Sequence, residues 1–231
     1  MNLGTRMPIF NVGALVYDWI TDQPLWKAQI ASIVEHFGDR PQAPRVLDLG
    51  CGPGVSSFAL SERVGTDAEI VGIDLASRMI ARAKIHHQRD HGHLGNMRFE
   101  VADATSLPFA DHSFDVAVGH SFLYLVQDRA AVLREIRRVL VPGGVLVLME
   151  PSRDGSILAA ARSGFGQAGA PGLAAGDRLR FTTSMLLWRL VSGAAGRMHP
   201  RLVERLFREG GFEHASCHPT LGGIGLHCIA S

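Results

Sequence analysis

The residues best placed to do chemistry stand where an apolar segment gives way to a glycine-rich turn. Asp48 lies near the end of that segment, and Gly50, Cys51 and Gly52 follow it. Glycine adopts backbone angles that other residues avoid, and a helix that begins after such a turn points its N–H groups at a ligand. A dinucleotide-binding turn would have its third glycine where Val55 stands, and the Asp48 carboxylate would repel a diphosphate. The turn therefore predicts a site for a ligand that carries a positive group.

Two further carboxylates follow other apolar segments. Asp74 closes the segment 69–74, about twenty residues beyond the turn, where an acidic side chain accepts hydrogen bonds from ribose hydroxyls. Asp103 closes the segment 97–103, and its carboxylate suits an adenine amino group. The three acids together predict a pocket for a ribose, an adenine and a cation, without phosphates. S-adenosylmethionine, which has a sulfonium and an α-ammonium group, meets that description.

Short segments rich in Val, Ile and Leu have to position these residues. Continuous apolar strands that alternate with helices are typical of a parallel sheet covered on both faces. The sequence therefore predicts a doubly wound, Rossmann-like α/β fold. We expect strands at 45–49, 69–74, 97–103, 114–120 and 145–150, and helices at 24–37, 55–64, 76–90, 128–140, 184–192 and 200–212.

The 231 residues are expected to form a single domain with four parts. These are an N-terminal helical cap (1–40), a cofactor-binding core (41–151), a lid insertion (152–200), and a closing helix and strand pair (201–231). An insertion at the carboxyl side of a parallel sheet lies over the ligand crevice, so we expect residues 152–200 to form a helical lid.

Composition excludes several classes of protein. Lys and Arg number 23 against 22 Asp and Glu, and this near-neutral charge argues against a nucleic-acid partner, which needs a cationic face. No apolar segment is long enough for a membrane span. Three cysteines are too few for a disulfide framework and fit a reducing compartment, so we expect a cytoplasmic protein, monomeric or homodimeric. The histidines at 86, 87, 91 and 93 lack zinc-site spacing, and we expect a solvated helix end and no metal.

Five motifs occur in a fixed order between residues 45 and 151: VLDLGCGPG, IVGIDLASRMI, VADATSLPF, FDVAVGHSFLYL and EIRRVLVPGGVLVLMEP. This set resembles the class I S-adenosylmethionine-dependent methyltransferases that act on small molecules. The resemblance implies a seven-stranded sheet whose last strand is antiparallel, and residues 212–217 and 223–229 are the matching pair. It also implies that S-adenosylhomocysteine is the product.

The resemblance assigns roles to particular residues. The turn, with Asp48, Gly50, Cys51 and Gly52, would hold the methionine part of the cofactor, and Asp74 would hold the ribose hydroxyls. The remaining cofactor contacts that it implies are Leu75 and Met79 against the adenine, Asp103 and Ala104 at the adenine edge, His120 and Ser121 on the methionine side, and Tyr17 in a segment that folds over the cofactor.

Methyl transfer to O, N or C of an acceptor is an in-line displacement, in which proximity and alignment supply much of the acceleration. A general base is needed only where the acceptor loses a proton. His120 and Tyr124 are the catalytic candidates, and Glu150 and His199 are further candidates at the same edge. His120 and Tyr124 also have a purely structural interpretation, His120 as a pocket wall or core histidine and Tyr124 as a packing residue at a helix start.

The lid is predicted to shape a site for a small, largely apolar acceptor. Either its apolar residues line a pocket and its arginines meet an acidic group, or the apolar residues pack on the sheet and the arginines are solvated. The residues concerned are Phe165, Phe181, Met185, Leu186, Leu187 and Trp188, with Arg178, Arg180 and Arg189.

Two other functions compete with methyl transfer. A binding or regulatory module would keep the cofactor fold without catalysis, and an NAD-dependent oxidoreductase would use the related dinucleotide fold. Val55 and Asp48 speak against the oxidoreductase.

Overall fold

The computed structural model describes residues 24–38, 41–160 and 175–231. Tyr17 and Phe165 lie outside the described residues, so their predicted contacts stay predictions. The side chain of Arg178 is not described either.

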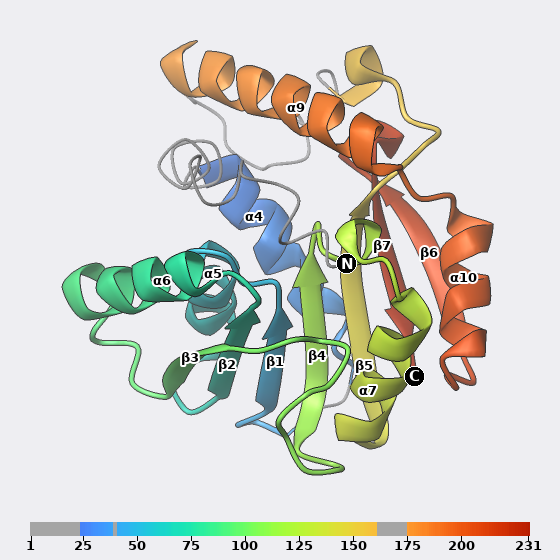
Figure 1. The fold of residues 1–231 in the computed structure, drawn as a ribbon. Helices are drawn as coiled ribbons and strands as arrows, with labels where there is room; N and C mark the ends of the chain where they lie inside the picture. The colour runs from blue at the N-terminus through green and yellow to red at the C-terminus, as the bar shows by residue number, and fades with distance from the viewer. Residues whose placement is uncertain (1–23, 39–40, 161–174) are drawn as a thin grey trace.

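A seven-stranded sheet forms the centre of the molecule, in the order β3-β2-β1-β4-β5-β7-β6 (Figure 1). Neighbouring strands from β3 to β5 are parallel, and β7 runs antiparallel to both β5 and β6. This confirms the predicted doubly wound sheet with its antiparallel last strand. The strands are β1 (Arg45–Leu49), β2 (Glu69–Asp74), β3 (Met97–Val101), β4 (Phe114–His120), β5 (Leu140–Pro151), β6 (Ala215–Thr220) and β7 (Gly225–Ala230).

Helices bury the apolar side chains of both faces of the sheet. One face packs against α4 (Pro24–Ser32), the 3₁₀ turn η1 (Ile33–His36), α5 (Val55–Val64) and α6 (Ser77–Asp90), and its core includes Trp26 and Val118. The other face packs against α7 (Arg129–Val139) and α10 (Pro200–Glu209), and its core includes Ile136 and Phe207. The strand order reverses between β1 and β4, so a crevice opens there at the carboxyl ends of the strands.

The long helix α9 (Ala175–Ala195) crosses above the carboxyl ends of the central strands (Figure 1). The indole Nε1–H of Trp188 donates to Ser121 Oγ at 3.0 Å, and Arg189 Nη1 donates to the Ser152 carbonyl at 2.6 Å. These bonds hold α9 against the ends of β4 and β5, and the helix lies within the segment 152–200 that the sequence predicts to form a lid. Whether the helix opens and closes as a lid stays a prediction.

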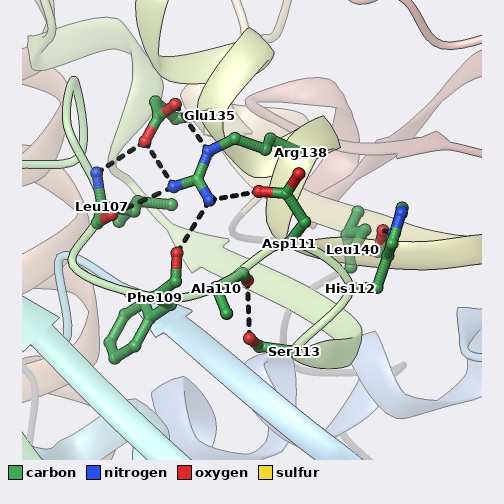
Figure 2. Close-up of polar contacts among 9 residues, drawn as sticks. All are labelled: Leu107, Phe109, Ala110, Asp111, His112, Ser113, Glu135, Arg138 and Leu140. Carbon is green, nitrogen blue, oxygen red and sulfur yellow. Dashed lines mark hydrogen bonds and ion pairs between the residues drawn. The ribbon is translucent and has the colours of Figure 1, made fainter.

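The loop between β3 and β4 is held by one arginine of α7 (Figure 2). Arg138 donates to the carbonyls of Leu107 and Phe109 and to the carboxylates of Asp111 and Glu135. Glu135 also accepts the Leu107 N–H at 2.7 Å. This network fixes the chain that directly follows Asp103.

Several element boundaries differ from the sequence prediction. β3 ends at Val101 rather than 103, and β5 begins at Leu140 rather than 145, so the Pro-Gly-Gly segment at 142–144 lies within the strand and does not precede it. The closing strands lie two to three residues later than predicted at their first residues, and α9 is longer than the predicted 184–192. Helix α4 ends at Ser32 and continues as η1.

The cysteines also differ from expectation. Cys217 of β6 and Cys228 of β7 face each other across the strand pair and form a disulfide, while Cys51 is free and buried. The low cysteine content therefore no longer supports a reducing compartment, and the cytoplasmic location stays a prediction. Among the helices of the described residues, none combines the length and apolarity that crossing a membrane requires.

Candidate active site

The glycine turn has the backbone geometry that the sequence predicts. Gly50 and Gly52 have φ angles of 67° and 55°, and Gly54, with φ 94°, forms the N-cap of α5. A Cβ at Gly50 would lie 2.8 Å from Cδ2 of Phe122, so both the backbone angle and the space require glycine there. The turn thus brings main-chain N–H groups and the start of α5 to the β1–β4 crevice.

Asp74 links the end of β2 to this turn. Its Oδ2 accepts the N–H of Gly52 at 3.1 Å, and its Oδ1 accepts the N–H of Ala76 at 2.8 Å. Burial raises the pKa of Asp74, and the two backbone hydrogen bonds oppose this rise. A carboxylate oxygen accepts more than one hydrogen bond, so the predicted bonds to ribose hydroxyls are compatible with this arrangement.

Asp48 lies beneath the turn with 1% of its surface exposed. Its Oδ2 accepts the hydroxyls of Ser56 and Ser57, both at 2.6 Å, whereas Oδ1 has no hydrogen-bond partner among the described residues. Burial raises the pKa of Asp48 to about 6, and the charge of Asp74 contributes to the rise. Burial raises the pKa of the Cys51 thiol, and the charges of Asp48 and Asp74 contribute to this rise. The turn is therefore flanked by anionic groups, which disfavour a diphosphate and favour a cationic ligand.

The predicted adenine end of the site lies beyond β2 and β3. Asp103 stands in a turn two residues after β3, where its Oδ1 accepts the N–H and the hydroxyl of Thr105, and Ala104 is part of the same turn. Leu75 is 45% exposed, as an apolar platform for a ligand would be, and Met79 is buried. Contact of these four residues with adenine stays a prediction.

A pocket opens between the glycine turn and helix α4. No charged side chain lines it. Its walls are Trp26, Ile30, Gly50, Cys51, Pro53, Val55, Ser56 and His120.

Three aromatic side chains extend this apolar wall toward α9. The ring of Trp26 lies 5.4 Å from that of His120, 5.6 Å from that of Trp188 and 6.1 Å from that of Phe181. The Nε1–H of Trp26 donates to Ser184 Oγ at 3.0 Å, which joins α4 to α9. The sequence analysis missed Trp26 as a site residue, because an aromatic residue at helical spacing is typical of a core. Its position on the helix that precedes the first strand was the available signal.

His120 is the candidate catalytic residue that the structure brings to the pocket. Its Nε2 is buried and has no hydrogen-bond partner among the described residues. Burial, with a smaller contribution from His227, lowers the pKa of His120 to about 3. The imidazole is therefore neutral at physiological pH. Its unpartnered nitrogen is available to a ligand.

Tyr124 and the other candidate bases make structural contacts. Tyr124 is 4% exposed and packs in the core on the α7 face of the sheet, so its predicted catalytic role receives no support. Glu150 accepts the N–H groups of Phe122, Leu123 and Tyr124 and thereby fixes the chain after β4. Burial raises the pKa of Glu150 to about 7. His199 is the N-cap of α10.

Ser121 connects the end of β4 to α9. It has a φ of 58°, which is uncommon for a residue with a side chain. Its N–H donates to the Met149 carbonyl at 2.7 Å, and its Oγ accepts the indole N–H of Trp188. Ser121 thus lies beside the crevice, as predicted, and its hydroxyl is already engaged by the helix above.

The histidine run is more buried than predicted. The ring of His91 stacks on that of Phe58 at 4.1 Å, and Nε2 of His87 lies 2.9 Å from the Leu94 carbonyl. The described part of the chain holds no group of three or more His, Cys, Asp or Glu side chains arranged to bind a metal ion.

Comparison with known proteins places this fold and site in a class. A family model described as a methyltransferase domain matches residues 42–175. The chain belongs to the class I S-adenosylmethionine-dependent methyltransferases. It is an enzyme, and S-adenosylmethionine is its cofactor. An NAD-dependent oxidoreductase and a non-catalytic module are thereby set aside.

The chain is also similar to individual proteins. It is 31% identical over 235 aligned positions to the ubiquinone/menaquinone biosynthesis C-methyltransferase UbiE of Ectopseudomonas mendocina, covering 94% of this chain and 84% of that protein. A putative S-adenosyl-L-methionine-dependent methyltransferase of Methanococcus maripaludis superposes with a TM-score of 0.69 at 22% identity, covering 95% and 91% of the two chains. Phosphoethanolamine N-methyltransferase 2 of Haemonchus contortus, in complex with S-adenosyl-L-methionine, gives 0.64 at 19% identity, covering 93% and 44%.

The residues present fit this cofactor. The glycines of the turn leave room for a ligand against the main chain, and the unpartnered Oδ1 of the buried Asp48 suits an ammonium group nearby. The paired carboxylates favour a cation rather than a diphosphate.

Proposed function

We propose that this enzyme transfers the methyl group to a small, largely apolar acceptor, with a ring carbon as the preferred site of attack and O or N as alternatives. The observation that carries this proposal is the uncharged pocket at the β1–β4 crevice, which is lined by Trp26 of α4 together with residues of the glycine turn. An apolar wall with few polar groups selects an apolar ligand. The name of the Ectopseudomonas relative, a C-methyltransferase, supports carbon as the attacked atom.

The residues of this chain would act mainly by binding and orientation. S-adenosylmethionine supplies an activated methyl carbon on its sulfonium. The glycine turn, Asp48 and Asp74 hold the donor, and Trp26 confines the acceptor against it. Alignment of this kind lowers the barrier of an in-line displacement without a strong base.

His120 orients an acceptor that carries a hydroxyl or an amine. Its neutral imidazole presents Nε2 as an acceptor of that group's hydrogen bond. Since its pKa is about 3, it holds a proton only briefly, and its main role is to position the acceptor.

Incubation of the purified enzyme with donor labelled in its methyl group tests the proposal. The acceptor panel comprises hydroquinones, phenols, aliphatic amines and phosphorylated amines, and mass spectrometry locates the label. We expect label on a ring acceptor, at carbon first. Faster transfer to a charged amine than to every ring compound would contradict the proposal.

Two variants separate the acceptor side from the donor side. Trp26→Leu is expected to raise the KM for the acceptor at least about tenfold, because it removes a buried aromatic wall. His120→Asn is expected to lower kcat with a hydroxylated acceptor. Both variants should bind S-adenosylhomocysteine as the unchanged enzyme does. A loss of that binding in His120→Asn would assign the residue to the cofactor site alone.

A further inference from the structure

Three histidines from three different elements meet on the α4 face of the sheet. His36 lies on η1, His218 on β6 and His227 on β7. Nε2 of His36 lies 3.2 Å from Nδ1 of His227, and the centroids of these two rings are 5.2 Å apart. The ring of His36 also stacks on that of His218, at 6.4 Å between centroids. His218 and His227 are directly paired across the antiparallel strands, so their side chains lie on one side of the sheet. We call these three residues the histidine cluster.

The histidine cluster holds the end of the segment that forms one wall of the pocket. Helix α4, which carries Trp26 of that wall, continues directly into η1. The bond between His36 and His227 ties η1 to β7. Next to it, Thr220 Oγ1 at the end of β6 donates to Gln29 Oε1 of α4 at 3.1 Å. The last two strands of the sheet therefore hold the α4–η1 segment through polar contacts.

Burial disfavours the charged form of the cluster. His227 is 7% exposed, and its Nε2 has no hydrogen-bond partner among the described residues. Burial, with smaller contributions from His36 and His218, lowers the pKa of His227 to about 4. Burial and His218 also lower the pKa of His36, while the charge of Glu35 on the same turn opposes this change. From β4, His120 of the pocket faces His227, which lowers the pKa of His120.

Protonation of both bonded rings would break the contact between η1 and β7. A neutral imidazole donates through one nitrogen and accepts through the other, whereas an imidazolium only donates. With His36 and His227 both charged, neither ring could accept the bond, and two like charges would stand 5.2 Å apart. Rings released into water would regain their ordinary pKa. The closed contact is therefore favoured above pH 6.5 and is lost as the pH falls toward 4.

We propose that the histidine cluster is a proton-sensitive clasp, which positions the α4–η1 segment against the sheet and releases it in acid. Its members are positioning residues, because none of them lines the pocket and they act through Trp26. Near neutral pH the clasp is closed and the pocket keeps its apolar wall. In acid the wall loosens and acceptor binding weakens. The effect on the acceptor rests on the proposed function, whereas the release of the wall does not.

Hydrogen exchange of the full chain at pH 7.5 and pH 5, corrected for intrinsic exchange rates, tests the clasp without an acceptor. We expect exchange in residues 24–37 to rise at least about tenfold relative to α7. The reason is that His227 alone, returning from a pKa of about 4 to its ordinary value, favours release about 30-fold at pH 5. In the double variant His36→Gln/His227→Gln, whose side chains are polar but cannot be charged, the rise should stay below about threefold. The matched control is His214→Gln, an exposed histidine just before β6, which should behave as the unchanged protein does.

A charged variant and a kinetic measurement add independent results. His36→Lys places a fixed positive charge beside His227, so exchange in residues 24–37 should already be fast at pH 7.5. With a ring acceptor, the KM of the unchanged enzyme should rise from pH 7.5 to pH 5 by a larger factor than kcat falls, and the double variant should lose this rise. Urea unfolding at pH 7.5 shows whether each variant is folded.

Four outcomes would overturn the clasp. These are an equal acid-induced rise of exchange in α7, a full rise in the double variant, slow exchange in His36→Lys at pH 7.5, and an acceptor KM that stays constant while residues 24–37 are released. Failure to methylate any ring compound would contradict the proposed function instead, and the exchange results would still decide whether the clasp exists.

Discussion

Replacing Asp74 by Ala tests the link between the end of β2 and the glycine turn. In the folded protein this carboxylate accepts two backbone N–H groups, at 3.1 Å from Gly52 and 2.8 Å from Ala76. Hydrogen bonds to charged groups contribute about 1.5–3 kcal/mol each. Part of this is recovered by water at the crevice, so we expect cofactor binding to weaken by about 1–3 kcal/mol, which is roughly a 5- to 150-fold rise in Kd.

Calorimetric titration with S-adenosylhomocysteine measures this change. Asp74→Asn keeps one carbonyl oxygen as an acceptor, so its Kd should fall between those of the unchanged protein and Asp74→Ala. Asp67→Ala is the matched control, because it removes an exposed carboxylate just before the opposite end of β2. A Kd for Asp74→Ala within twofold of the unchanged value would refute the reasoning. An equal weakening in Asp67→Ala would show that net charge, and not the local bonds, governs binding.

Three further changes probe the turn, the β3–β4 loop and the pocket histidine. Gly50→Ala should weaken cofactor binding about tenfold or more, because its Cβ meets Phe122, whereas Gly143→Ala, with a similar φ but open space, should leave calorimetric Kd unchanged. Arg138→Met should lower the free energy of unfolding in urea by about 1–3 kcal/mol, and the exposed Arg134→Met on the same helix should have little effect. The pKa of His120 is lowered on folding, so the unfolded chain takes up its proton first and the protein loses stability as the pH falls below 6.5. Between pH 6.5 and pH 5, the free energy of unfolding in urea should therefore fall by about 2 kcal/mol less in His120→Asn than in the unchanged protein.

The sheet and the donor half of the site follow from local sequence. The strands are predicted because segments such as 69–74 are apolar on both faces, a pattern typical of strands whose sheet is covered by helices on both sides. Gly50 and Gly52 are predicted because the turn needs positive φ angles. Asp74 is placed at the end of its strand by the same pattern, although its bonds to Gly52 and Ala76 depend on the tertiary fold.

The acceptor half does not follow from local sequence. Trp26 is held at the pocket by a hydrogen bond to Ser184, a residue 158 positions away. No local sequence pattern predicts such a pairing. Tyr124 was predicted as a catalyst from its place after β4, but Glu150 draws the backbone there into a 3₁₀ turn that directs the ring into the core. Likewise, the start of β5 at Leu140 depends on its pairing with Phe114, which overrides the Pro and Gly residues that follow.

The hydrogen bond between Trp26 and Ser184 has a consequence for how this enzyme could diverge. It joins two segments, one before β1 and one after β5, that make no part of the glycine turn or of Asp74. Substitutions in α4 and α9 can therefore reshape the chamber for the incoming molecule while the donor stays equally well held. In this way one inherited fold could evolve to accept different substrates through changes in α4 and α9 alone.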